Sequence, residues 1–458
     1  MFLRNRFVRS FAAMIYSQLS GIAIQLMLVP LLIHFWGITL YGTWLLLSAV
    51  PFYLTFSDFG FTFIAKNEMV MAVAHGNRPA ALRTFQSVLV MLLIAIPAVF
   101  LAMAATSFLF DLSGLLKLHG YPNGQARLVF TVLVANVALF QFCPLLCGGI
   151  RAENRPATEA MLLSISRMFE GIVIVAAALF GGGLLAAALA ILANRIVFLV
   201  IIYVVMRRMS PWVKLGWKEA RLDEIKRLFH PALAYMFMPM AQALLIQGPV
   251  LVIGQLLDPV AVVVFSTSRT LARLGTAGTN VLTNGFVTEY AALAGRNDVP
   301  AFTRLFRRHI ALCAAAIIGY ATIILVFDDR LMQIFTHGKV PIVEPFFVVV
   351  VLGVVAEMTW STLFTPISAV NRHRLVTYAY FASCFVGIFA CFPLTRHFGI
   401  AGAATVVAAV NALMIPLNLW LCRPARLLDG HAVRLRSAFN VGEADLQDHE
   451  TPADTSLI

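Results

Sequence analysis

The chain has 458 residues, of which 60% are hydrophobic and 12% are charged, and its net charge is +12. A soluble globular protein is about one-quarter charged. The composition therefore excludes a soluble domain, and long apolar runs along the whole chain predict an all-α protein that crosses the membrane many times. The short alternating segments of a membrane β-barrel do not occur.

Hydrophobic windows of about 19 residues predict twelve spanning helices. In chain order they cover residues 11–35, 43–65, 86–110, 126–150, 158–181, 184–206, 231–256, 261–290, 308–328, 344–370, 375–396 and 401–422. The first run is longer than the core of a signal peptide and lacks a cleavage site of small residues, so we expect it to be the first spanning helix.

Positive charge is distributed unequally between alternate connections. One side holds most of the 34 Lys and Arg residues, within 4–9, 66–83, 151–155, 207–227, 296–308, 372–374 and 423–436. The other side holds only Lys117, Arg127, Arg330, Lys339 and Arg396. The positive-inside rule places the basic side in the cytoplasm, so we expect both termini there. This bias explains the net charge without a nucleic-acid partner.

The two halves of the chain share landmarks at a constant offset of 217 positions. The pairs include Gly37 and Gly254, Gly182 and Gly399, and Asn194 and Asn411. The loops 74–86 and 294–308 are also similar, after a short insertion. A duplication of six helices gives two parallel copies, related by an axis along the membrane normal.

We therefore predict two parallel six-helix lobes around a central cavity, with boundaries at 1–206 and 231–422. Residues 207–230 form a cytoplasmic linker between them. This linker is a candidate interfacial helix, with its two tryptophans at headgroup depth. Residues 423–458 are polar and acidic, and we expect them to be a disordered cytoplasmic tail.

Two arginines on the eighth predicted span do not suit a lipid environment. Arg269 and Arg273 are one turn apart on one helical face, and that face carries no acid. An arginine near the middle of a spanning helix costs about 2.5–3.5 kcal/mol. We therefore expect this face to line a water-filled cavity, where the two guanidinium groups bind an anion.

Two further arginines and an acid lie in the fifth and sixth spans. Arg167 and Glu170 are three positions apart, which is the spacing of a local ion pair. Arg195 has no acid within a turn, so it either lines the lumen or pairs with an acid from another helix. Arg167 and Arg195 are thus additional candidates for binding substrate, and Glu170 is a candidate for ion coupling.

Two acids lie in the tenth and second spans. Glu357 is near the middle of the tenth, where a carboxylate is either the partner of an arginine or a protonatable coupling site. Asp58 lies near the cytoplasmic end of the second span. It caps a helix break at Gly60, pairs with an arginine, or takes part in proton or sodium coupling.

Sequence signatures of common enzymes do not occur. There is no P-loop, no GxSxG and no HExxH. The ten histidines and six cysteines lack metal-ligand spacing. We therefore expect no catalytic residues, no metal and no cofactor, and leave coupling to H⁺ or Na⁺ open.

Several short motifs carry a resemblance to a known family. The first half contains YGTW at 41–44, DFG at 58–60 and the turn GNR at 76–78, and the second half contains STSR at 266–269 and FGIAGAA at 398–404. In these motifs the chain resembles the polysaccharide transporters (O-antigen and exopolysaccharide flippases) of the multidrug/oligosaccharidyl-lipid/polysaccharide exporter superfamily. The resemblance extends over most of residues 1–422.

The resemblance implies a MATE-like fold and a location in the bacterial inner membrane. It also implies translocation of an undecaprenyl-pyrophosphate-linked oligosaccharide from the cytoplasmic to the periplasmic leaflet, alongside a polysaccharide polymerase and assembly proteins. Arg269 and Arg273, helped by Arg195 and Arg167, would then hold the pyrophosphate.

Two alternatives remain. One is a cation-coupled multidrug exporter of the same superfamily. The other is a membrane glycosyltransferase or ligase that uses lipid-linked sugar, and it would need carboxylates in a sizeable external loop. The longest external connection, residues 111–125, holds a single acid.

Overall fold

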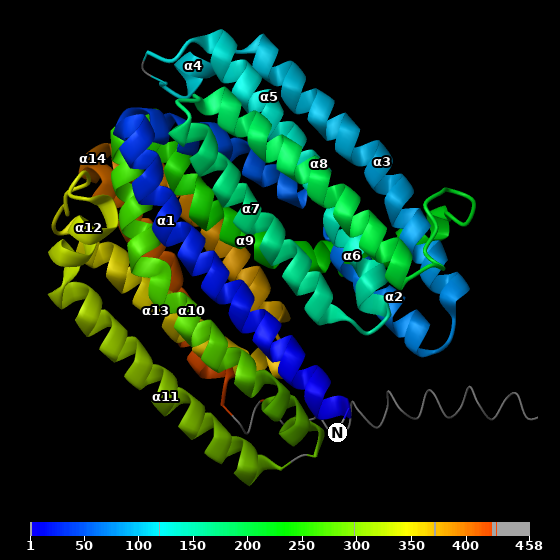
Figure 1. Ribbon diagram of the computed structural model, residues 1–458. Helices are drawn as coiled ribbons and strands as arrows, with labels where there is room; N and C mark the ends of the chain where they lie inside the picture. The colour runs from blue at the N-terminus through cyan, green and yellow to red at the C-terminus, as the bar shows by residue number, and fades with distance from the viewer. Residues whose placement is uncertain (1, 119, 297, 371, 424–426, 428–458) are drawn as a thin grey trace, which may run out of the picture.

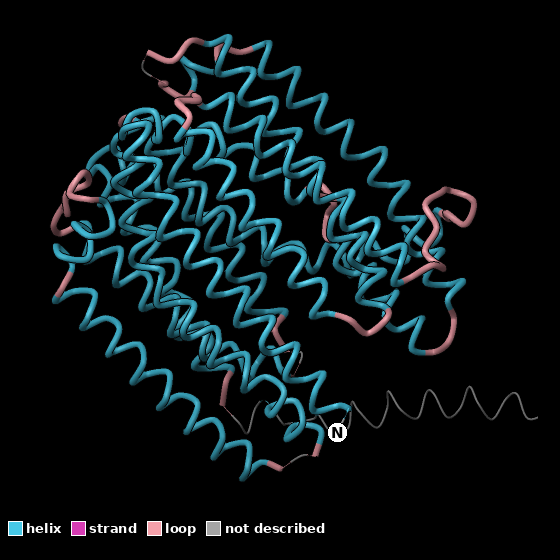
Figure 2. Tube along the Cα trace, viewed as in Figure 1, coloured by secondary structure: helices cyan, strands magenta, loops and turns pink. Residues whose placement is uncertain are grey.

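The computed structural model describes residues 2–118, 120–296, 298–370, 372–423 and 427. The predicted tail, 423–458, therefore lies almost entirely outside the described residues. Helices and their connections make up the described chain, which contains no strand (Figure 2). The fold is all-α, as the sequence predicts.

The helices of the first half follow one another with short connections. They are α1 (Phe2–Phe52), the 3₁₀ helix η1 (Tyr53–Phe56), α2 (Phe61–Ala74), α3 (Arg78–Leu109), α4 (Leu112–Leu115), α5 (Asn123–Phe140), α6 (Phe142–Ala152), α7 (Pro156–Leu179) and α8 (Leu184–Met209). The second half comprises α9 (Leu222–Leu256), α10 (Pro259–Gly295), α11 (Val299–Val326), α12 (Asp328–Thr336), α13 (Phe346–Ala369) and α14 (Arg374–Leu421).

Two of these helices are each broken at a glycine, which accounts for the predicted number of spans. Backbone φ is +73° at Gly37 in α1 and +61° at Gly399 in α14, a region that glycine enters without steric cost. The 48 residues of α14 would extend about 70 Å, more than twice the apolar thickness of a bilayer. Each half of α14 is thus one span. In the same way, the part of α1 before Gly37 forms the first span, and the rest of α1 forms the second span together with η1 and α2. Helices α5 and α6 together form a single span.

The loops that match between the two halves also share a helix cap. Asn77 accepts a hydrogen bond from the amide of Ala80 at 3.0 Å and starts α3. Asp298 accepts one from the amide of Ala301 at 3.0 Å and starts α11. A side-chain oxygen at this position satisfies an amide that the helix leaves free. The third helix of each half therefore begins in the same way, which is what a duplication predicts.

Two groups of helices lie side by side with α1 between them. The first-half helices α3, α5, α7 and α8 form one group, and α9 to α14 form the other (Figure 1). Helix α1 packs against α7 on one side and α10 on the other. In Figure 1 the α2–α3, α6–α7 and α8–α9 connections lie on the right and the α10–α11 connection lies at the bottom, whereas α4 and α12 lie at the opposite end, at the top and left. The basic connections thus gather at one end of the bundle.

The connection between the lobes differs from the predicted interfacial helix. Residues 210–221 form turns, and α9 begins only at Leu222. The backbone of this connection is bound to buried side chains of α3: Gln86 donates to the Lys214 carbonyl at 3.0 Å and accepts from the Glu219 amide at 2.8 Å. Trp217 is exposed, whereas Trp212 turns inward and donates to Glu153 at 2.6 Å. Hydrogen bonds to the first lobe replace those of a helix, because buried side chains supply partners for this backbone.

Helix α9 contacts both lobes in turn. Near its start, Arg227 forms an ion pair with Glu68 of α2 at 2.8 Å, and the ring of Tyr235 stacks on Phe63 of α2 at 3.7 Å. Two residues later, the ring of Phe237 contacts Phe381 of α14 at 4.9 Å. Pro239 lies next to this change of partner, and a proline inside a helix removes the hydrogen bond to the carbonyl four residues earlier, here that of Tyr235.

Candidate functional site

The two arginines of α10 face a narrow cavity inside the second lobe. The cavity lies between α10, α13 and α14 and is lined by Phe265, Arg269, Arg273, Val350, Gly353, Val354, Glu357, Ala404, Val407 and Asn411. Arg269 and Arg273 share it because side chains four positions apart lie on one helical face. The prediction that these two side chains face the same space inside the bundle therefore agrees with the structure.

An acid from another helix partly compensates this arginine pair. A terminal nitrogen of Arg273 lies 2.7 Å from Oε2 of Glu357 on α13. The sequence shows no acid on the helical face of the arginines, and the partner comes from 84 positions away. Of the two predicted roles of Glu357, the structure shows the ion pair, and its role in ion coupling stays a prediction.

Arg269 has no carboxylate partner within 4 Å among the residues that the structure describes. Its guanidinium donates to the backbone carbonyl of Ile246 on α9 and lies 5.4 Å from the ring centroid of Phe265. The cavity side chains thus carry two positive charges and one negative charge. A net positive charge remains at a depth where charges are expensive.

The cavity is too small for the predicted substrate group. Its volume is about 20 Å³, and a cavity of roughly 10–15 Å³ holds one water molecule. A pyrophosphate does not fit without movement of the surrounding helices. The water-filled cavity expected around Arg269 and Arg273 is, in this structure, a space for one water or one small ion.

Asn411 of α14 is also among the residues around this cavity. The side chain is fully buried, and its Oδ1 accepts from the indole N–H of Trp360 at 3.0 Å. Because an indole only donates, this bond fixes which end of the amide is the oxygen. The amide nitrogen of Asn411 then points elsewhere and has no hydrogen-bond partner. The sequence marked Asn411 only as a landmark of the duplication and gave no sign of its place beside the arginines.

A second buried ion pair lies in the first lobe. Arg195 of α8 is 5% exposed, and its guanidinium lies 2.7 Å from Oε2 of Glu170 on α7. It also donates to Oδ1 of Asn136 on α5 at 3.1 Å and stacks over the ring of Phe140 at 4.7 Å. The second of the two alternatives predicted for Arg195, an acid on another helix, is the one observed.

The predicted local pair between Arg167 and Glu170 is wrong. Glu170 pairs with Arg195 instead, because the guanidinium of Arg195 is buried and would destabilise the fold strongly without a carboxylate partner. Arg167 is exposed, and its Nε donates at 3.4 Å to the Leu163 carbonyl of its own helix. The structure therefore does not bring Arg167 together with Arg269 and Arg273.

Asp58 acts as a cap for α2. Its carboxylate accepts from the amide of Gly60 at 3.0 Å and from that of Thr62 at 3.3 Å. Gly60 has a φ of +78°, so the chain turns sharply at this point. This is the capping role among the predicted alternatives, and a role in ion coupling stays a prediction.

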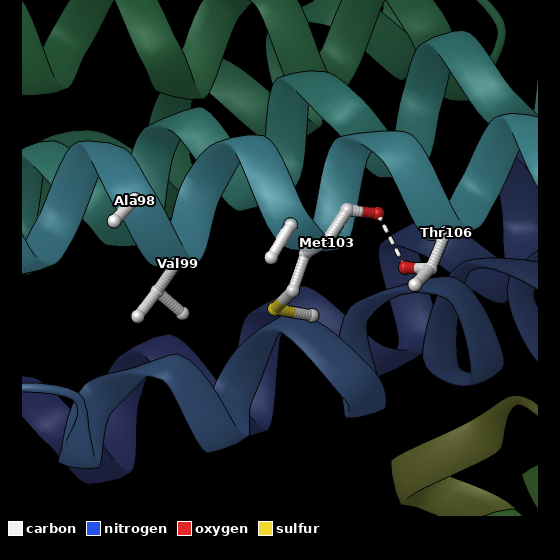
Figure 3. Close-up of a pocket in the computed structure, with 5 residues that line it drawn as sticks. Ala98, Val99, Met103 and Thr106 are labelled. Atoms are coloured by element: carbon white, nitrogen blue, oxygen red, sulfur yellow. Dashed lines mark hydrogen bonds between the residues drawn. The ribbon is translucent and has the colours of Figure 1, made fainter.

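Another cavity, of about 370 Å³, is lined mainly by apolar side chains. It runs along α3 and is lined by Ala98, Val99, Ala102, Met103 and Thr106 (Figure 3). The hydroxyl of Thr106 donates to the Met103 carbonyl at 2.8 Å, so its polarity is already satisfied. The lining contains no charged side chain, and this groove is therefore no candidate for binding an anion.

The helix arrangement belongs to a known class of fold. Two six-helix lobes with these connections are the fold of MATE transporters, and solved structures of that class cover almost the whole chain. No protein-family model matches the sequence, and no curated protein is significantly similar to it.

Three solved structures show the likeness in detail. An inward-facing multidrug resistance MATE family transporter of the MOP superfamily matches with a TM-score of 0.63 and 14% identity, over 92% of this chain and 95% of that one. A MOP superfamily transporter from Pyrococcus furiosus, described as having a binding pocket of reverse polarity, matches with a TM-score of 0.60 and 13% identity, over 93% and 96%. A MATE in complex with MaL6 gives 0.56 and 13%, over 93% and 96%. At these identities the likeness defines the fold, and the substrate is a separate question.

Proposed function

We propose that this protein translocates an undecaprenyl-pyrophosphate-linked oligosaccharide from the cytoplasmic to the periplasmic leaflet of a bacterial inner membrane. The lobes would alternate access by rocking, as parallel-repeat transporters do. The product would supply O-antigen, capsule or exopolysaccharide assembly, alongside a polymerase. The MATE-like fold and the short motifs shared with the polysaccharide transporters support this proposal.

One observation carries the choice of an anionic substrate: within the described part of the chain, the guanidinium of Arg269 has no carboxylate partner, and it lies beside the Arg273–Glu357 ion pair. A pyrophosphate offers several oxygens to the planar donors of two arginines. Once the lobes separate and the cavity widens, it takes the place of Glu357 on Arg273 and neutralises Arg269. Glu357 is then free to bind a proton or Na⁺, which gives the coupling role predicted for it a physical basis.

Arg195 lies in the other lobe, and its ion pair with Glu170 is already balanced. It is therefore a weaker candidate for the pyrophosphate than Arg269. Arg167 is exposed and is not among the residues that line the cavity, so it serves as a matched control for the loss of an arginine.

A cation-coupled multidrug exporter is the second candidate, because a multidrug resistance MATE transporter shares the fold. Pocket polarity distinguishes the two candidates. The reverse polarity described for the Pyrococcus furiosus protein is taken there to suggest a different function within this fold. The net positive cavity of the present chain repels the cationic compounds that such exporters expel.

The test combines a deletion with arginine variants. Deletion of the gene should abolish a surface polysaccharide and leave its lipid-linked repeat unit on the cytoplasmic side. Complementation with Arg269→Gln plus Arg273→Gln should restore at most about a tenth of the parental rate, because hydrogen bonds to charged groups contribute about 1.5–3 kcal/mol each. Arg167→Gln should complement fully. An intact polysaccharide with new sensitivity to cationic drugs would instead establish the exporter.

A further inference from the structure

The connection between α8 and α9, residues 210–221, holds large apolar side chains at the surface. Leu215 is 49% exposed and Trp217 is 77% exposed, and Leu222 at the start of α9 is 69% exposed. In Figure 1 this connection lies on the right, beside α3. Apolar side chains that gather at one exposed place mark a site of contact with a protein or a membrane more often than a chance feature of the surface.

Hydrogen bonds to the first lobe fix the backbone of this connection. Gln86 of α3 binds the backbone on both sides of Leu215 and Trp217. The hydroxyl of Ser87, also on α3, accepts from the amide of Arg221 at 2.9 Å. The two apolar side chains are therefore held at the surface in a fixed arrangement, and a partner binds them without the cost of ordering the loop.

Exposed basic residues surround these apolar side chains, and they are Arg208, Lys214, Lys218 and Arg221. None of their side chains forms an ion pair or a hydrogen bond within the described part of the chain. Other bases at the same end are paired, as Arg151 is with Glu159. Residues 207–221 contain five bases and a single acid, Glu219. The surface is thus positively charged and fits an anionic partner.

The exposed face of α8 leads directly to this surface. Val197, Val200 and Val204 are 55%, 56% and 40% exposed and lie on one face of the helix, because they are three and four positions apart. Arg208 follows four positions later on the same face. An arginine just beyond an apolar stripe of a spanning helix lies at the level of the lipid headgroups, where its charge reaches water and phosphate. The connection that begins at Ser210 therefore lies at the membrane surface.

We propose that Arg208 and residues 210–221 form a binding surface for anionic phospholipids. The headgroups contact the bases, while Leu215 and Trp217 enter the acyl region next to the headgroups. A lipid surface offers negative charge and apolar chains at adjacent depths, which is the combination that this surface matches. Because the connection is bound to α3, the lipids hold the first lobe at one depth in the membrane. This binding does not depend on the proposed function.

The experiment measures tryptophan fluorescence of the full-length protein in vesicles of phosphatidylcholine with a minor share of phosphatidylglycerol. In one set the phosphatidylglycerol is brominated near the carbonyl end of its acyl chains, and in the other set an equal amount of the phosphatidylcholine is. The difference in quenching between the parent and Trp217→Phe reports Trp217, because the other tryptophans are common to both. This difference should be at least about twofold larger with brominated phosphatidylglycerol, since each nearby base attracts anionic lipid.

Charge variants separate the recognition of anionic lipid from apolar insertion. Lys214→Gln plus Lys218→Gln should lose most of the preference for brominated phosphatidylglycerol and keep the parental unfolding midpoint, because both side chains are exposed. Lys117→Gln plus Arg330→Gln removes the same number of exposed bases at the opposite end of the bundle and should keep the preference.

Three results would overturn the proposal. Equal quenching of the parent and Trp217→Phe by both brominated lipids would show that Trp217 does not reach the acyl chains. Equal quenching of Trp217 by the two lipids would show insertion without recognition of anionic lipid. If aqueous acrylamide quenches Trp217 in vesicles as strongly as it quenches free tryptophan, the surface faces water and is left for a soluble protein partner.

Discussion

In the Arg273–Glu357 ion pair, substitution of Glu357 should destabilise the protein more than substitution of Arg273. Glu357→Gln leaves Arg269 and Arg273 facing each other as like charges, one helical turn apart. The side chains of the pair are 32% and 21% exposed, so an effective dielectric constant of about 20 applies. Unit charges at about 4 Å then interact by about 4 kcal/mol, and charges at about 6 Å by about 3 kcal/mol. The substitution also removes part of the desolvation cost of the carboxylate. Glu357→Gln should therefore lower the free energy of unfolding by about 3–5 kcal/mol, the usual cost of breaking a buried pair.

Arg273→Gln removes the same attraction but also the repulsion from Arg269. Glu357 then remains near one cation, and the group is electrically neutral. The remaining loss should be about 1–2 kcal/mol, from the difference between the two interaction energies above. The sequence alone gives no reason for this order, because it does not place Glu357 beside either arginine.

Chemical denaturation in micelles measures this difference, with all samples at one salt concentration. The double variant Glu357→Gln plus Arg273→Gln completes the cycle, and the coupling energy should be about 4 kcal/mol, which is the attraction between the two side chains alone. Arg167→Gln, the exposed control, should stay within about 0.5 kcal/mol of the parent. If Glu357→Gln is no more destabilising than Arg273→Gln, Arg269 does not contribute the field assigned to it here.

Three further predictions concern other parts of the molecule. Glu170→Gln leaves Arg195 buried without a carboxylate and should destabilise the fold by about 3–5 kcal/mol in the same denaturation assay. The additional change Arg195→Gln should restore stability, which is the check. Pro239→Ala restores a backbone hydrogen bond where α9 changes partner, so it should raise the unfolding midpoint and slow transport. A parental transport rate would contradict a role of the missing hydrogen bond in transport. Partial burial and two nearby aspartates raise the pKa of Glu344 in the connection before α13, so its ionisation opposes folding as the pH rises through that pKa. Glu344→Gln should therefore raise the midpoint at neutral pH and have no effect in acid, as thermal scans at the two pH values would show.

Much of the fold follows from local sequence patterns. Apolar runs set the positions of the helices because any backbone in lipid must satisfy its own hydrogen bonds. The chain breaks α1 and α14 at Gly37 and Gly399, both of which are landmarks of the predicted duplication. The linker is different: its amphipathic pattern makes a helix possible throughout, but says nothing about Gln86, the distant side chain that binds the backbone before Leu222 in a non-helical form.

The sequence by itself determined that the protein crosses a membrane, which of its connections are basic, and that arginines lie at mid-membrane depth. It did so because hydropathy and charge are properties of consecutive residues. Only the tertiary structure decided which acids meet those arginines, since the partners are 25 and 84 positions away and depend on how each helix is rotated about its axis. That rotation leaves Arg269 without a carboxylate among the described residues beside the Arg273–Glu357 ion pair, and the chemistry proposed for this protein begins with that arrangement.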